Sequence, residues 1–219
     1  DGTTDGTLQL NCSQNTHGVK IKSPSHSAGQ SYTLTLPTTA PSTNKFLKTD
    51  GSGNLSFADA GGITEADTWM VTSTFSNSSN GTDEVKTSNW ARQVAATYGS
   101  FDKIGTGMSE SSGIFSFPST GIYHVTWNSY FDLSSATSSA NIKIQVSNNG
   151  GSNYGNQAVS GCGSDSNRGQ TVNAQCFVDV TSTSNVKVRF LTNGGTYINW
   201  FGDANATYTY ATFVRLGDT

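Results

Sequence analysis

The segment GIYHVTWNSYFDL, residues 121–133, alternates between apolar and polar side chains. Successive side chains of a β-strand point to opposite faces, whereas those of a helix repeat every ~3.6 residues, so the pattern indicates a strand. One face carries Tyr123, Val125, Trp127, Phe131 and Leu133, and the other carries His124, Thr126, Asn128 and Asp132. The segment therefore predicts a long strand that is buried on one side.

The same period of two recurs through the C-terminal part of the chain, with Gly, Ser and Asn between the segments as in turns. The segments are TWMVTSTF (68–75), NIKIQV (141–146), TVNAQCFVDV (171–180), VKVRF (186–190) and TYTYATFVRL (207–216). They predict an antiparallel sandwich over residues 63–219. In the last segment the alternation groups Tyr208, Tyr210, Val214 and Leu216 on one face. A spacing of four between Trp90 and Val94 predicts a helical turn within 89–99.

Residues 1–62 have shorter apolar patterns, and the chain divides near DAGGITEAD (59–67). LQLNC (8–12), VKIK (19–22) and YTLTLP (32–37) predict strands, and FLKTDGSGNLSF (46–57) predicts a hairpin with Asp50 and Gly51 in its turn. Sheets this thin cannot exclude water on both faces. We therefore expect residues 1–62 to form a β-rich connector that intertwines with neighbouring chains.

The amino-acid composition limits the classes of partner that the chain is expected to bind. Charged residues are 12% of the chain and the formal net charge is −3, which argues against nucleic acid, because that affinity comes mainly from clustered Lys and Arg. No stretch approaches the ~20 apolar residues of a membrane span, so no membrane insertion is expected. Leu, Ile, Val and Phe make up about 19% of the residues, and a folded chain so poor in apolar residues often completes its core against copies of itself. The start, DGTTDGTLQL, lacks Met, and we expect a processed or missing segment before it.

Three cysteines are an odd number, so at least one thiol lies outside any intrachain disulfide. Cys12 and Cys176 fall on apolar faces and are predicted to be buried thiols. Cys162 lies in a Gly- and Ser-rich stretch that predicts a loop. The sequence does not decide whether Cys162 and Cys176 form a disulfide, and the cysteine spacings fit no zinc motif.

The search for catalytic chemistry returns no recognisable motif. His17 and His26 could form a metal pair or make surface hydrogen bonds, and no carboxylate lies between them. Cleavage of a glycan needs two carboxyl groups about 5–9 Å apart, and the candidates lie mostly in turns: Asp102, Glu110, Asp132, Asp165, Asp179 and Asp203. We expect no catalytic residue, no resident metal and no enzyme activity. Calcium stays possible at SGCGSDSNRG (160–169) and WFGDANAT (200–207), where Asp and Asn oxygens could bind it or cap their own turns.

Two loops carry aromatic rings beside amide and carboxylate groups, a combination that suits sugar rings. The first, within 194–210, supplies Tyr197, Trp200 and Asp203, and the second, within 148–157, supplies Tyr154. The alternative is that Tyr197 and Trp200 close the end of the sandwich. Loops on a rigid β scaffold are common binding sites, so these four residues are the candidate glycan-binding residues.

Residues 66–219 resemble the C1q and tumour-necrosis-factor jelly-roll family. Phe115 is followed by SFPST and then GIYHVTW (121–127), which is the family's spacing, and the ending VKVRFLTNGG…TYTYATFVRL is similar to its last strands. Val125, Trp127 and Met108 depart from the family's usual aromatics, and Thr212 or Phe213 replaces a usual Gly. The resemblance implies a ten-stranded sandwich packed as a homotrimer, with Tyr123, Tyr208 and Tyr210 at or near the threefold interface.

Residues 8–57 resemble a module of virion proteins from marine tailed phages. The order NTHGVKIKSP, YTLTLP, LKTDGSGNLSF carries this resemblance. It implies a connecting segment that trimerises, with Leu34 and Leu36 among its interface residues, and that attaches to other virion proteins. The protein would be assembled in the host cytoplasm and would act outside the cell.

Together these observations predict a trimeric tailed-phage fibre or appendage protein whose jelly-roll head binds a host-surface polysaccharide. Two alternatives stay open. One is a capsid decoration or head-fibre protein with no host-binding role, and the other is a glycan depolymerase.

Overall fold

A computed structural model describes residues 5–14, 17–59, 61–92, 101–134, 138–164 and 168–219. The chain divides into two compact units, unit 1 (Asp1–Gly62) and unit 2 (Ile63–Thr219). In the described part of the chain, no helix is both long and apolar enough to cross a membrane. Helical structure in that part is confined to one 3-10 turn, η1 (His26–Ala28).

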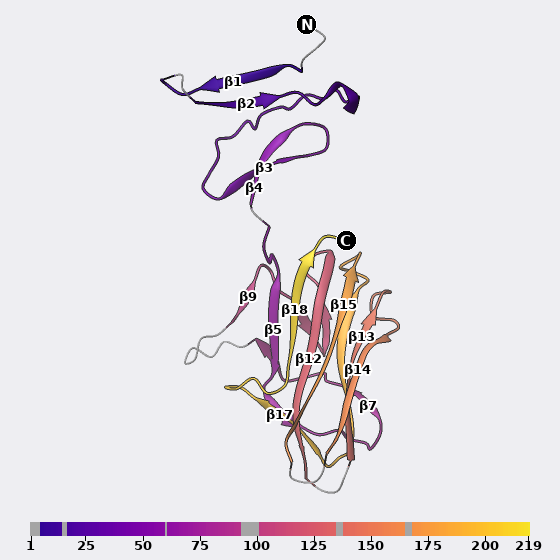
Figure 1. Ribbon diagram of the computed structural model, residues 1–219. Coiled ribbons are helices and arrows are strands. Elements are labelled where there is room, and N and C mark those ends of the chain that lie inside the picture. Colours follow the sequence, from indigo (N-terminus) through magenta and orange to yellow (C-terminus); the bar gives the residue numbers. More distant parts are fainter. Residues whose placement is uncertain (1–4, 15–16, 60, 93–100, 135–137, 165–167) are drawn as a thin grey trace. The chain divides into compact units, whose positions relative to one another are not determined.

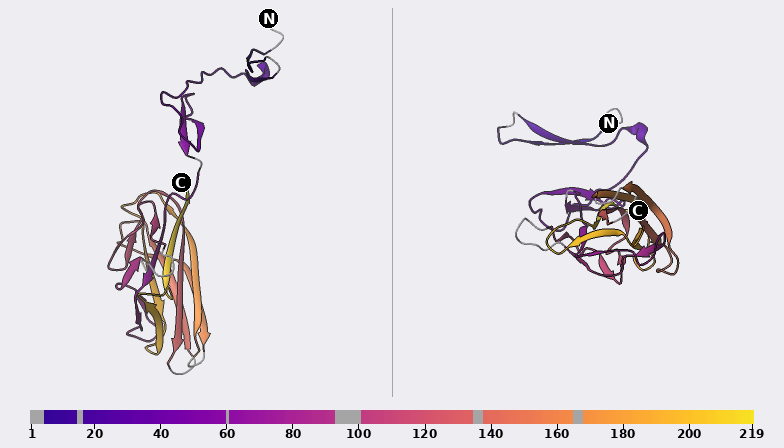
Figure 2. Two further views of the ribbon diagram at one scale, coloured as in Figure 1. Left: turned by 90° about the vertical axis from the view of Figure 1, so that its left-hand side faces the viewer. Right: turned by 90° about the horizontal axis from the view of Figure 1, so that it is seen from below.

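Unit 2 consists of two antiparallel sheets that face each other (Figures 1 and 2). Sheet I contains, in order, β10 (Ser109–Ser111), β11 (Ile114–Ser116), β16 (Lys187–Asn193), β13 (Ser138–Ser147) and β14 (Gly155–Ser164), and β7 (Asp83–Val85) also pairs with β16. Sheet II contains β6 (Ser73–Phe75), β17 (Ile198–Asp203), β12 (Gly121–Leu133), β18 (Tyr210–Gly217), β5 (Ala66–Val71) and β8 (Trp90–Arg92), with β15 (Gln170–Val180) on β12 and β9 (Lys103–Ile104) on β5.

The chain passes repeatedly between the two sheets. It leaves sheet II after β12, forms β13 and β14 in sheet I, returns for β15, crosses again for β16 and ends in sheet II with β17 and β18. This is the topology of an antiparallel jelly roll. The all-β sandwich predicted for residues 63–219 is therefore confirmed.

Strand β12 organises sheet II, because it pairs with β15, β17 and β18. Its side chains alternate without exception between buried and half-buried positions from Gly121 to Leu133. The face predicted from the sequence is the core face, and Val125, Trp127, Phe131 and Leu133 are each fully buried. The pattern could be read correctly because the strand is buried on one side only.

The centre of the core is a group of aromatic rings. Phe115 lies 5.1 Å from Trp90, 5.4 Å from Phe190 and 5.4 Å from Phe213 between ring centroids. Such edge-to-face and tilted contacts add to the burial of apolar area. Trp90 belongs to strand β8, so the predicted helical turn is wrong at its start, and Val94 lies outside the described residues. Pairing with β5 and the aromatic core fix Trp90 in a strand.

In and just before strand β18, the core face is not the one that carries Tyr208, Tyr210, Val214 and Leu216. Ala211 and Phe213 are buried, whereas Tyr208 and Leu216 are exposed. Both faces of TYTYATFVRL carry apolar side chains, so the alternation alone could not identify the core face. The smaller of the two sets packs inward, and the tyrosines point away from the sandwich core.

Unit 1 contains two separate hairpins. Strand β1 (Thr7–Asn11) pairs with β2 (Gly18–Lys22), and β3 (Lys45–Thr49) pairs with β4 (Leu55–Asp59). The predicted 46–57 hairpin is present, with a longer turn in which Asp50 accepts hydrogen bonds from the Ser52 and Asn54 backbones. The predicted strand at 32–37 is wrong, since there only Thr35 forms an isolated bridge, with Asn54.

The cysteines also differ from expectation. Cys12 is exposed rather than buried, because unit 1 has no core to cover it. Cys162 lies in β14 rather than in a loop, and Cys176 is half-buried in β15. None of the three forms a disulfide. Burial raises the pKa of the Cys176 thiol to about 11.

Candidate functional site

The outer face of sheet II is the first candidate surface. Neighbouring strands align Phe177, His124 and Val214 in one row across β15, β12 and β18, and Asn173, Asn128 and Tyr210 in another. Phe177 is 67% exposed and its ring centroid lies 5.3 Å from that of His124. The face combines aromatic, Thr and Asn side chains with two carboxylates, Asp132 on β12 and Asp179 on β15. Of these residue types, the aromatic ones are enriched in the cores of protein interfaces.

An aromatic cluster occupies one end of this face. The centroid of the Tyr130 ring lies 5.1 Å from Phe201 and 5.8 Å from Tyr208, and the Phe201 and Tyr208 centroids are 6.0 Å apart. Tyr208 is 42% exposed. The three rings come from β12, β17 and the segment before β18, and they present one apolar surface outside the sandwich.

The predicted interface residues separate into two kinds. Tyr208 and Tyr210 lie on the outer face, and Leu34 and Leu36 are 54% and 74% exposed in unit 1. Tyr123 is only 1% exposed, packs on Phe117 and bonds through its hydroxyl to Ser119. Its side chain is part of the core and cannot supply interface surface, because it follows the inward face of β12.

The outer face of sheet I has a different character. Lys143, Lys187 and Arg189 point outward from β13 and β16, since their neighbours along each strand are buried. The ammonium of Lys143 lies 2.6 Å from Asp83, and Arg189 donates to Gln145. Lysines are depleted from interface cores, so this part of sheet I is less suited to an interface than the aromatic part of sheet II.

The predicted glycan-binding residues do not form one site. Trp200 is fully buried and donates from Nε1 to Asn77, so its prediction as a binding residue is wrong and it closes the sandwich. The Tyr154 ring is covered by the Arg189 guanidinium 3.9 Å away, and burial raises the pKa of its hydroxyl. Asp203 caps the Asn205 backbone at 2.7 Å. Only Tyr197, 41% exposed, presents an open ring.

Tyr197 borders a depression of about 210 Å³ at one end of the sandwich. Its lining consists of Asn80, Gly81, Ser139, Asn193, Gly194, Gly195 and Tyr197. These residues come from the segment before β7, the start of β13 and the connection between β16 and β17. Segments distant in the sequence thus build one polar, uncharged hollow.

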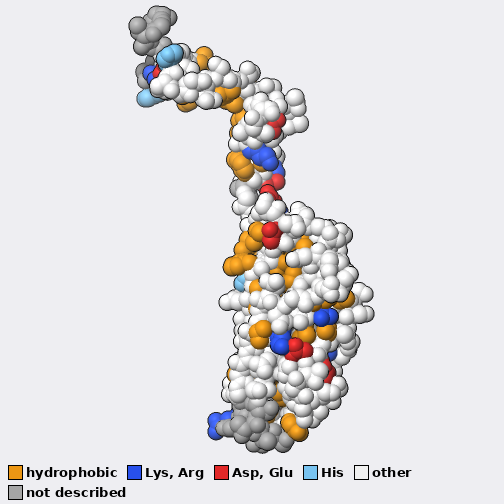
Figure 3. Space-filling model, turned by 90° about the vertical axis from the view of Figure 1, so that its right-hand side faces the viewer, with side chains coloured by type: hydrophobic (Ala, Val, Ile, Leu, Met, Phe, Trp, Pro, Cys, Tyr) orange, Lys and Arg blue, Asp and Glu red, His pale blue; other side chains and the backbone are white. Residues whose placement is uncertain are grey.

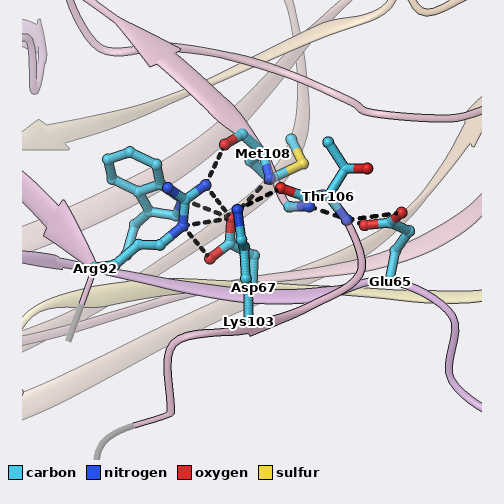
Figure 4. Close-up of polar contacts among 8 residues, drawn as sticks. Glu65, Asp67, Arg92, Lys103, Thr106 and Met108 are labelled. Carbon is cyan, nitrogen blue, oxygen red and sulfur yellow. Dashed lines mark hydrogen bonds and ion pairs between the residues drawn. The ribbon is translucent and has the colours of Figure 1, made fainter. Parts of the chain in front are cut away.

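A polar cluster joins β5 to β8 and to the 103–108 segment (Figure 4). Asp67, 2% exposed, accepts hydrogen bonds from Arg92, from the Trp69 indole and from the Met108 backbone. The Arg92 guanidinium lies 4.4 Å from the centre of the Trp69 ring.

Glu65 accepts from the backbones of Thr106 and Gly107 in the same region. Every oxygen of these two carboxylates that the structure describes is engaged by protein donors. The cluster therefore fastens the 103–108 segment to β5.

The residues considered for metal or acid–base chemistry are dispersed. His26 is exposed in η1, His17 Nδ1 lies 4.0 Å from the Cys12 sulfur, and His124 bonds to Gln175. Within residues 5–14, 17–59, 61–92, 101–134, 138–164 and 168–219, no three His, Cys, Asp or Glu side chains gather to hold a metal ion. Asp165 of the calcium candidate 160–169 lies outside the described residues.

Several carboxylates of the catalytic search have structural partners. Glu110 caps the Gly113 backbone, and Asp132 accepts from Asn199 at 2.9 Å. Both interactions are the local turn and cross-strand contacts that Asp and Glu commonly make.

Comparison with known proteins adds information on the fold alone. No protein-family model and no curated protein matches the chain. The crystal structure of murine APRIL at pH 8.5 is similar over 69% of this chain and 98% of that chain, with 12% identity and a TM-score of 0.47. The Eiger TNF structure from S. frugiperda is similar over 70% of this chain and 93% of that chain, with 15% identity and a TM-score of 0.46. The likeness concerns a TNF-like jelly-roll sandwich.

Two groups of residues in these clusters are not predicted by the sequence patterns. Asp67, at the end of the divide, shares a period of two with Trp69 and Val71, and this pattern indicates a buried carboxylate in need of a cation. Asn80 and Asn193 gave no signal, because neutral amides in Gly- and Ser-rich stretches are common in turns. Their role depends on a tertiary arrangement that spacing cannot report.

Proposed function

We propose that this protein is a non-enzymatic structural component of a tailed-phage virion, a homotrimeric fibre or appendage protein. Unit 1 is its assembly segment, and the jelly roll of unit 2 attaches to a host-surface glycan. The observation that carries the proposal is the apolar surface of unit 1. None of its described residues is buried, and nine large hydrophobic side chains are between 46% and 74% exposed.

The exposed residues of the first hairpin are ordered on one face. The register pairs Leu8 with Ile21 and Leu10 with Val19, so these four side chains lie together, and Lys20 and Lys22 lie on the other face. Figure 3 shows exposed hydrophobic side chains along unit 1. An isolated two-stranded hairpin is at best marginally stable in water, so this face needs a cover.

Further copies of the same chain are the proposed cover. Burying apolar area contributes about 25 cal/mol per Å², and three amphipathic hairpins can bury their apolar faces against one another around a threefold axis. Leu34 and Leu36, also exposed in unit 1, would add apolar area to such an interface. Lys and Asp residues are nearly balanced in unit 1, so copies of it do not repel one another strongly.

Unit 2 supplies a second contact surface on the outer face of sheet II. The Tyr130, Phe201 and Tyr208 cluster and the half-buried Tyr210 resemble the centre of an obligate interface, which is aromatic and poor in charge. The resemblance to the C1q and tumour-necrosis-factor family supports a trimer through this head. Three heads on one assembly would bind a repetitive surface with avidity even if each site is weak.

The virion assignment rests on the resemblance of residues 8–57 to a module of phage virion proteins. That module precedes varied C-terminal domains, so it suits a segment that connects a head to other virion proteins. The extracellular role and the glycan ligand follow from this assignment and belong to the proposal.

Two neighbouring substitutions test the assembly role. Ile21→Ser removes an apolar side chain from the proposed interface, and Lys20→Ser alters the opposite face of the same strand; both residues are exposed in the single chain. Light scattering at micromolar concentration should show that Ile21→Ser shifts the trimer toward single chains and that Lys20→Ser leaves the mass unchanged. Equal behaviour of the two variants would refute the proposed interface.

A further inference from the structure

We propose that the depression between Asn80, Asn193 and Tyr197 binds one pyranose ring of a neutral polysaccharide. The inference rests on the proposed attachment function, and it names the ligand class and the place of attachment. The earlier sequence candidates Tyr154, Trp200 and Asp203 are not part of this site.

Hydrogen bonds within the protein hold the residues around the depression in place. Asn80 Oδ1 accepts from the Thr196 backbone at 2.8 Å, and its Nδ2 donates to the Tyr197 hydroxyl at 3.2 Å. The Tyr197 carbonyl accepts from the Ser134 backbone at 2.8 Å, and the Gly81 backbone donates to the Gly194 carbonyl at 2.7 Å. A preorganised site loses less entropy on binding.

The lining is uncharged. Two acidic side chains lie beside it. The Asp83 carboxylate bonds to Lys143 and to Asn193 Nδ2, both at 2.6 Å, and Glu84 Oε1 accepts from the Ser78 and Ser79 backbones next to Asn80. Burial by itself raises the pKa of Asp83, but the hydrogen bonds from Lys143 and Asn193 outweigh this and lower the pKa overall. The uncharged lining and the neighbouring carboxylates favour a neutral ligand over a phosphorylated or sulfated one.

Polar groups remain available for the ligand. Asn193 uses its amide nitrogen on Gly81 and Asp83, which fixes its orientation and leaves Oδ1 as an acceptor. Among the described residues, no partner reaches Asn193 Oδ1 or the Ser139 hydroxyl. A hydroxyl-rich ligand matches this set of one acceptor and one group that both donates and accepts.

Tyr197 provides the apolar element. Its ring is 41% exposed beside the depression, and such a ring can stack on the C–H face of a pyranose. A Cβ added at Gly195 would lie 2.9 Å from the Tyr197 ring, and one at Gly194 would lie 2.2 Å from Ile198. Glycine at both positions thus lets the backbone lie close against these side chains and keeps the hollow open.

The site occupies the end of unit 2 where β12 and β16 finish and β7, β13 and β17 begin. The chain enters unit 2 near Ala66, at the opposite end of the sandwich, where β18 also finishes. A ligand at the Tyr197 end does not compete with the entry of the chain into the sandwich.

Saturation-transfer NMR on the 219-residue chain, with glucose, galactose and N-acetylglucosamine as separate probes at millimolar concentration, tests the site. At least one sugar should give transfer signals that Tyr197→Ala weakens at least tenfold and Ser139→Ala weakens severalfold. Tyr197→Phe keeps the ring and should retain most of the signal. Phe101→Ala is the matched control, because Phe101 is also 41% exposed, and it should change nothing.

Mass and thermal unfolding of each sample separate this inference from the proposed function. A folded trimer that binds none of the three sugars, or a Tyr197→Ala variant that is folded and binds as the parent does, would overturn the site while leaving the assembly intact. A single chain that binds sugar through Tyr197 would support the site and overturn the trimer.

Discussion

Strands of unit 1 and unit 2 show the same alternation of apolar and polar residues, but their apolar side chains are exposed in unit 1 and buried in unit 2. The β1 and β2 strands of unit 1 have five residues each and every one of these residues is exposed, whereas β12 of unit 2 has 13 residues and a fully buried apolar face. The burial differs because unit 2 has a second β-sheet that packs on the first. Unit 2 supplies a sheet on each side of its core, and unit 1 offers amphipathic hairpins with nothing of its own to cover them.

This contrast teaches where the chain needs other copies of itself. A sandwich of two sheets can be stable alone, whereas a thin hairpin requires a partner to bury its apolar face. We therefore expect substitutions in unit 2 to act within a single chain and substitutions in unit 1 to act through assembly.

The largest effect is expected in the aromatic core of unit 2. Phe115→Ala removes a fully buried ring that contacts Trp90, Phe190 and Phe213, and it should lower the free energy of unfolding by about 3–5 kcal/mol. All four tryptophans lie in unit 2, so their fluorescence during chemical denaturation measures this unit. A loss below about 1 kcal/mol would contradict the central role assigned to Phe115 in the core of unit 2.

The buried ion pair should give an effect of similar size. Asp67→Ala leaves the Arg92 guanidinium without its carboxylate in a half-buried site, which costs about 3–5 kcal/mol. Asp218→Ala is the control, since the Asp218 side chain is 93% exposed in its pair with Arg215, and exposed pairs contribute about 0–1 kcal/mol. Equal denaturation midpoints for the two variants would contradict the assigned role of Asp67.

Dilution should affect the two units differently. If association covers the β1 and β2 hairpin, its amide hydrogens lose protection at least tenfold when the protein is diluted below its dissociation range. Those of β12, which bond within one chain, keep theirs. Hydrogen exchange followed by mass spectrometry measures both in one sample. Protection of β1 and β2 that is independent of concentration would mean that unit 1 is stable alone.

The smallest effect concerns acid stability. The pKa of Asp83 lies below its ordinary value of 3.8, because the hydrogen bonds from Lys143 and Asn193 outweigh the effect of burial. Its stabilisation is thus present above about pH 4 and is lost as the pH falls through the lower folded-state pKa. Asp83→Asn should be a few tenths of a kcal/mol less stable at pH 7, and the difference should shrink as the pH falls toward 2. A constant difference across this range would contradict the assignment.

The sequence allowed much of unit 2 to be predicted, because its strands are long and buried on one face. Tyr123 shows the limit, since its strand and inward face were evident while its proposed interface role does not fit a buried ring. The prediction of Trp200 as a binding residue was wrong for a related reason. A tryptophan among polar residues is compatible both with an exposed binding loop and with the edge of the core. The Tyr197 depression needed three distant segments to be placed together.

The mass of the unmodified 219-residue chain in solution is the most direct test of the account. Sedimentation equilibrium at micromolar concentration should give three times the 23.1 kDa of one chain. A mass of 23.1 kDa would mean that the exposed face of unit 1 has no partner in other copies, and it would contradict the proposed trimer.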